Sequence, residues 1–129
     1  MASLDTEKGL IDELKGRICS LDPPMKKVDL VGTCVDRIKG IPYKMEEKTD
    51  IDILALYEIS RREFKKRTNL PRDSDIVEMK EFVDRELGPI GDCKVDSYLV
   101  FGDNEKKYEE KLKENEESIL IYDSEEKEQ

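Results

Sequence analysis

The sequence contains no histidine and no tryptophan among its 129 residues. Without histidine, the chain cannot form a Ser-His-Asp triad, a Cys-His pair, a His-ligated zinc site or an imidazole pH switch. It also lacks the Gly-x-Gly-x-x-Gly and Gly-Lys-Ser/Thr patterns, which form the common dinucleotide and phosphate cradles. We therefore expect a protein that is not an enzyme, with no catalytic residues, no cofactor and no bound metal.

Cysteines and long apolar runs are also scarce. Cys19, Cys34 and Cys93 are odd in number and far apart, which suits neither a disulfide framework nor a four-ligand zinc site. The N-terminus lacks the apolar segment of a secretory signal. No apolar run exceeds five residues, whereas a membrane span needs about 20. These observations predict a soluble intracellular protein, cytoplasmic or nuclear, with free thiols and no membrane contact.

The composition predicts one domain with an acidic end. Hydrophobic residues make up 36% of the chain and charged residues 43%, a supply that suits one modest core. We expect a single helix-rich domain over residues 1–123 and an acidic end over residues 124–129. The net charge is −9, and residues 103–129 contain eleven acidic and five basic residues, a net of −6. The acidity therefore lies mostly in the last quarter of the chain.

Apolar spacing and end signals predict helices over 5–20, 50–68, 75–87 and 105–117, with strands over 95–101 and 119–122. Segment 23–39 fits two structures, of which we favour the helix because its end signals agree with the apolar period. Pro23 at a first helical turn, with a stop at Gly40, favours a helix. The β-branched stretch 28–35 is the evidence for a strand.

The predicted fold class is α+β and helix-rich, with an N-terminal helical bundle followed by a small strand–helix–strand element. The two strands of that element are expected to form a parallel pair. A third strand would come from 28–35, a second copy or a partner.

A basic cluster is the first candidate binding site, for phosphate or an acidic partner. It consists of Arg61, Arg62, Lys65, Lys66, Arg67 and Arg72. Such a stripe can neutralise phosphates, and Tyr57 or Phe64 would stack on bases if exposed. The alternative is a solvated helix end, where cations complement the helix dipole and Glu58 pairs with Arg62.

A short apolar run near the C-terminus is the second candidate site. Ile119, Leu120, Ile121 and Tyr122 are flanked by acids. A segment of this type can add as a strand to a partner's open sheet edge. The alternative is an ordinary edge strand in the domain's own sheet.

Two Asp-x-Asp pairs, Asp50/Asp52 and Asp73/Asp75, are interpreted as helix caps. A metal-dependent hydrolase that uses Asp50 or Asp52 with Glu78 and Lys80 is the third functional hypothesis. The leading hypothesis is a non-catalytic protein-interaction, assembly or regulatory protein that binds a protein partner or forms a homo-oligomer. The second is a nucleic-acid-associated small subunit that contacts phosphate through residues 61–72.

Overall fold

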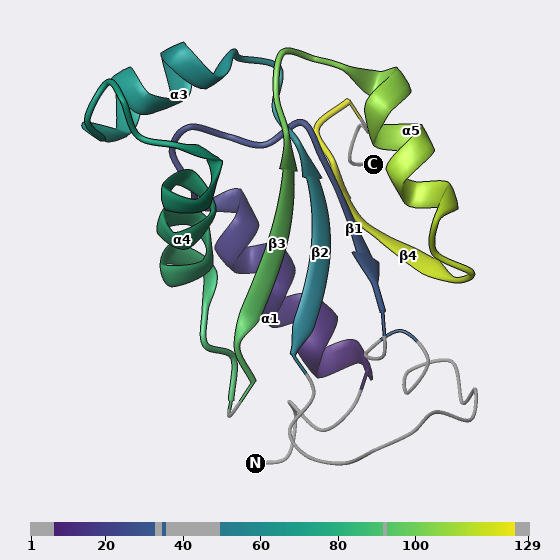
Figure 1. Ribbon diagram of the computed structural model, residues 1–129. Helices are drawn as coiled ribbons and strands as arrows, with labels where there is room; N and C mark the ends of the chain where they lie inside the picture. Colours follow the sequence, from purple (N-terminus) through teal and green to yellow (C-terminus); the bar gives the residue numbers. More distant parts are fainter. Residues whose placement is uncertain (1–6, 33–34, 36–49, 92, 126–129) are drawn as a thin grey trace.

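The computed structural model shows a four-stranded mixed sheet with helices on both faces (Figure 1). It describes residues 7–32, 35, 50–91 and 93–125. The elements in these ranges are α1 (Glu7–Cys19), β1 (Lys27–Val31), β2 (Ile51–Leu56), α3 (Arg61–Thr68), α4 (Ile76–Leu87), β3 (Val95–Val100), α5 (Glu105–Lys113) and β4 (Ser118–Asp123).

The strands lie in the order β3-β2-β1-β4. β2 and β3 are parallel, with Ile51 opposite Val95. β1 is antiparallel to both of its neighbours, and its pairing with β4 shifts register between Val28 and Asp29. The two edges of the sheet are therefore β3 and β4.

Each face of the sheet is covered differently. α1 and α4 lie on one face and α5 on the other, which we call the α5 face (Figure 1). The larger core cluster joins α1 and α4 to all four strands and includes Leu14, Leu30 and Val83. The smaller cluster, on the α5 face, contains Leu54, Leu56, Val100 and Tyr108. α5 is a short helix, and Tyr108 is its buried residue.

The expected N-terminal helical bundle is wrong, because helices and strands alternate along the chain. The helix favoured over 23–39 is also wrong where the structure describes it, since Lys27–Val31 forms β1. Val28 and Leu30 are fully buried against the helices on one side. The β-branched run thus pairs within the sheet, and tertiary packing overrides the helical end signals. The predicted stop at Gly40 lies outside the described residues.

The helix predicted over 50–68 is wrong in its first half. Ile51–Leu56 forms β2, and the helix begins only at Arg61, with Ser60 as its N-cap. β2 lies between β3 and β1 and is buried on both faces. A strand of that type reads as a continuous apolar run, which periodicity alone cannot distinguish from a buried helix.

Four predicted elements are confirmed with shifted ends, at α1, α4, β3 and β4, and α5 is confirmed but ends earlier, at Lys113. Asp75 caps α4 through a capping box with Glu78, as the cap interpretation of Asp73/Asp75 expects. The expected parallel pair is wrong, since β3 and β4 lie at opposite edges of the sheet. Among the described residues, no helix combines the length and apolar character that crossing a membrane requires.

A buried hydrogen bond fixes α5 to the sheet. The Tyr108 hydroxyl donates to Asp29 Oδ2 at 2.5 Å, and it also lies 3.2 Å from the carbonyl oxygen of Leu54. Both side chains are buried. Burial raises the pKa of Asp29, and the bond from Tyr108 opposes that rise. The bond therefore satisfies a carboxylate that would otherwise lie unpaired beneath α5.

We expect Tyr108→Phe to lower the free energy of unfolding by about 1–3 kcal/mol, because it leaves the buried Asp29 carboxyl without its donor. Urea unfolding at pH 7 measures this change. Tyr122→Phe is the matched control, since its hydroxyl has no hydrogen bond to a described residue, and it should change stability by less than about 0.5 kcal/mol. Equal effects of the two substitutions would contradict the assigned role of the Tyr108 hydroxyl.

Candidate functional site

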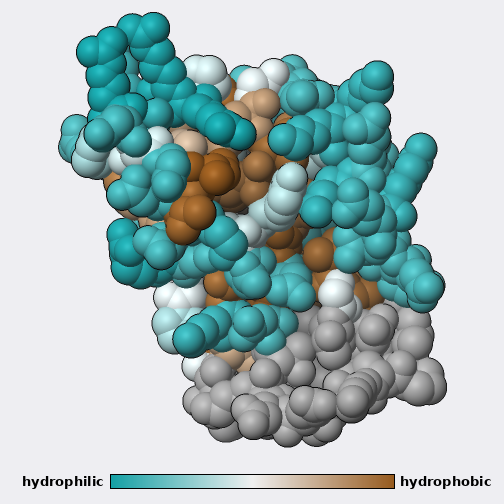
Figure 2. Space-filling model, in the orientation of Figure 1, coloured by the Kyte–Doolittle hydropathy of each residue, from teal (hydrophilic) through white to brown (hydrophobic). Residues whose placement is uncertain are grey.

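The basic cluster lies on α3 and the segment that follows it, at one corner of the molecule. Long hydrophilic side chains project from this corner (Figure 2). Arg62, Lys65, Lys66 and Arg72, with Leu70, line an open pocket of about 300 Å³, which we call the cationic pocket. The structure thus brings together four of the six predicted basic residues.

The other two basic residues and the predicted aromatic partners are placed differently. Arg67 pairs with Asp22 at 2.8 Å, and Arg61 does not line the pocket. Tyr57 and Phe64 are fully buried and pack against each other, so neither can stack on a base. The expected pairing of Glu58 with Arg62 is not formed, because Glu58 precedes the helix.

The apolar run 119–122 forms most of β4. The strand pairs with β1 along one edge and ends the sheet on the other. No hydrogen bond joins this outer edge to another segment within the part of the chain that the structure describes. Leu120 is 45% exposed, while Ile121 is buried. The strand therefore belongs to the domain's own sheet, and no described segment pairs with its outer edge.

The opposite edge of the sheet, at β3, is guarded by side chains. The Ser97 N–H donates to Asp84 Oδ1 at 2.9 Å, and Lys80 Nζ donates to Asp84 Oδ2 at 2.6 Å. Lys80 also pairs with Asp96 on the same edge strand. Such charged cover blocks edge-to-edge pairing. The β3 edge is therefore covered by charged side chains, whereas no described segment bonds the outer edge of β4.

A carboxylate cluster lies at the beginning of β2 and β3. Asp52 is opposite Asp96, and a Cβ at Gly32 would lie 2.5 Å from Asp52 Oδ2. Burial, together with the nearby charges of Asp96 and Asp50, raises the pKa of Asp52 to about 6. The predicted cap role of Asp52 is wrong, since the residue lies within β2.

The structure brings together only some of the residues of the hydrolase hypothesis. The positive charge of Lys80 lowers the pKa of Asp52, whereas the Glu78 side chain is hydrogen-bonded in the α4 capping box. Among residues 7–32, 35, 50–91 and 93–125, no group of three or more carboxylates or thiols is arranged to hold a metal ion. The juxtaposition of Asp52, Asp96 and Lys80 has no sequence signal, because 44 residues separate the two aspartates.

A second carboxylate cluster surrounds one lysine at the opposite end of the strands. Lys26 Nζ lies 2.7 Å from both Asp103 and Glu105, 3.6 Å from Glu125 and 4.0 Å from Glu58. The hydrogen bonds to Asp103 and Glu105 raise the pKa of Lys26. Four acids surrounding one cation leave this end of the molecule negative. No pattern in the sequence indicates this role of Lys26, since its partners are distant along the chain.

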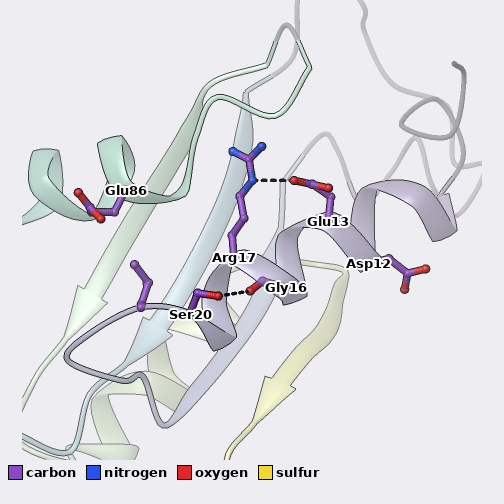
Figure 3. A pocket seen from close by; sticks show the side chains of 7 residues that line it. Asp12, Glu13, Gly16, Arg17, Ser20 and Glu86 are labelled. Carbon is purple, nitrogen blue, oxygen red and sulfur yellow. Dashed lines mark hydrogen bonds and ion pairs between the residues drawn. The ribbon is translucent and has the colours of Figure 1, made fainter.

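A hollow of about 370 Å³ lies beside α1 and is lined by acids and one arginine (Figure 3). Arg17 bonds Glu13 at 2.8 Å and donates to the carbonyl oxygens of Leu87 and Pro89, each at 2.8 Å. These bonds hold α1 against the end of α4. Arg17 is engaged in these contacts, so we interpret the hollow as part of the packing between α1 and α4.

Comparison with known proteins found no family model, no curated protein and no solved structure that matches this chain.

The raised pKa of Asp52 predicts a pH-dependent gain of stability in Asp52→Asn. The pKa of an aspartate in an unfolded chain is about 3.9. Between about pH 4 and pH 6 the folded state therefore keeps the Asp52 proton that the unfolded state has lost. Stability therefore falls as the pH rises through this window, and the full penalty is present above it. Partial exposure screens the penalty, so we expect Asp52→Asn to raise the unfolding free energy at pH 7.5 by about 1 kcal/mol.

Thermal unfolding at pH 7.5 and pH 4 measures this difference. The gain should disappear at pH 4, where Asp52 is protonated in the folded protein. Asp50→Asn, at an exposed neighbouring position, is the control and should gain less. A gain of equal size at both pH values would show that the effect does not come from the carboxylate charge.

Proposed function

We propose that this protein is a non-catalytic interaction or assembly module, and that a partner chain binds by adding a strand to the outer edge of β4. The observation that carries the proposal is the contrast between the two sheet edges. Side chains from α4 guard β3, whereas β4 keeps an outer edge that no described segment bonds. An uncovered edge strand presents backbone N–H and C=O groups in the spacing that an incoming strand requires.

The side chains of β4 favour pairing. Ile119–Tyr122 contains neither proline nor a charged residue, which are two of the features that block an edge. A third such feature, a register shift, is present in its pairing with β1. Leu120 is the most exposed large side chain of the strand, on the α5 face. It can pack against a side chain of the incoming strand, and such cross-strand pairs contribute about 0.2–1 kcal/mol each.

The charges beside β4 select the kind of partner. Glu116 precedes the strand and Glu125 follows it. A centred antiparallel pairing of two copies would place Glu116 of one copy opposite Glu125 of the other, and like charges in opposite positions are destabilising. The proposal therefore commits to a different protein, with an apolar extended segment between lysines or arginines. An intracellular location fits, because Cys19 and Cys93 are free thiols.

A synthetic peptide of alternating valine and isoleucine between pairs of lysines tests the proposal on the full chain. We expect it to bind and to shift the backbone amide resonances of Ile119–Tyr122 in NMR spectra. Leu120→Lys should weaken binding by about tenfold, because it removes an apolar contact and repels the lysines.

Val77→Lys is the matched control, since Val77 is an exposed apolar residue on α4. It should leave the peptide affinity unchanged. A peptide that fails to bind at low salt would overturn the proposal, as would equal weakening by both substitutions. Concentration-dependent dimerisation lost in Leu120→Lys would instead establish a second copy as the occupant and would also overturn it.

A further inference from the structure

The cationic pocket has a lining of unusual composition for an acidic protein. Among the described residues, four cations and Leu70 line the pocket, and none of these lining residues is an acid. The protein as a whole carries a net charge of −9. The four cations attract an anion at short range, while the net negative charge of the whole protein repels it at longer range. The attraction on a ligand is therefore confined to the pocket.

The fold itself builds the pocket. α3 ends where Asn69 adopts a left-handed conformation, with φ of 63°, and the chain turns back. Lys65 Nζ then donates to the carbonyl oxygens of Arg72 at 2.7 Å and Ser74 at 3.2 Å. These bonds hold the returning segment against α3 and bring Arg72 beside the helix. The four cations therefore lie close together because the bonds from Lys65 hold the backbone of the returning segment beside α3.

The cations of the pocket are largely unpaired. Arg62, Lys66 and Arg72 form no side-chain hydrogen bond or ion pair with a described residue. Arg67, which is paired with Asp22, is absent from the lining. Three neighbouring positive charges without a carboxylate repel one another. Binding of an anion would relieve that repulsion.

The donor chemistry favours phosphate. Two guanidinium groups offer planar pairs of N–H donors that match phosphate oxygens, and Lys66 adds a compact charge. With Tyr57 and Phe64 buried, no aromatic ring of the cluster is available to hold a base. A terminal diphosphate carries on the order of three negative charges at neutral pH, and two phosphates of a nucleic-acid backbone carry about two. Both values are close to the charge that the unpaired cations supply.

We propose that the cationic pocket binds two adjacent phosphate groups, either of a free diphosphate compound or along a nucleic-acid backbone. Arg62 and Arg72 each bind phosphate oxygens through their guanidinium groups, and Lys66 neutralises remaining charge. Lys65 fixes the position of Arg72 and is a positioning residue. The site is independent of strand addition at β4, since the two share no residue.

Calorimetric titration of the full chain with sodium pyrophosphate tests this site. We expect binding at 50 mM salt that weakens as the salt concentration rises, as for any phosphate contact. Arg62→Gln and Arg72→Gln should each weaken binding by about tenfold. Arg61→Gln is the matched control, because Arg61 is on the same helix outside the lining, and it should change affinity by less than about twofold. Unchanged thermal unfolding of all three variants confirms that they are folded.

One further ligand, an oligonucleotide, separates the two sources of phosphate, and either result with it supports the site. A short single-stranded oligonucleotide that binds more tightly than pyrophosphate, with the same variant pattern, identifies a nucleic-acid backbone. An oligonucleotide that binds no more tightly identifies a free diphosphate. The proposal is overturned if pyrophosphate does not bind at low salt, if Arg61→Gln weakens it as much as Arg62→Gln, or if polyglutamate binds while pyrophosphate does not.

Discussion

The Asp84 carboxylate accepts a hydrogen bond from the Ser97 backbone N–H at 2.9 Å, and much of the rest of the structure follows from that contact. Every backbone N–H along a sheet edge needs a partner or water, and this bond supplies one at β3. Lys80 neutralises Asp84 and also pairs with Asp96, opposite Asp52. Charged side chains of α4 thus cover β3, and β4 is the edge to which we propose that a partner chain adds a strand.

Charge is segregated across the same fold. The acids near Lys26 gather at the end of the parallel strands, next to α5, while the cationic pocket lies on α3. α3 and α5 stand on opposite sides of the sheet's upper end (Figure 1). No ion pair joins residues 61–72 to 103–125 in the described part of the chain. Lys26 binds Asp103 and Glu105 instead, and Arg67 binds Asp22, so the two charged regions do not neutralise each other through these pairs.

Local signals predicted local structure well. The cap interpretation of Asp73/Asp75 placed the start of α4 correctly, because a cap acts within one turn of the helix. The position of β2 was missed, since its strand is buried on both faces and pairs with β3, 44 residues later in the chain. The cationic cluster was predicted, but its pocket was not. Leu70 and the bonds from Lys65 to the returning segment have no pattern in the sequence.

The open edge of β4 is the central claim, and amide hydrogen exchange in the free protein tests it most directly. The account predicts rapid exchange at the β4 amides that face away from β1, and slow exchange at those that bond β1. The Ser97 amide, at the guarded edge, should exchange slowly because Asp84 holds it. If every amide of Ser118–Asp123 were as protected as those of Lys27–Val31, the edge would be covered and the account would be contradicted.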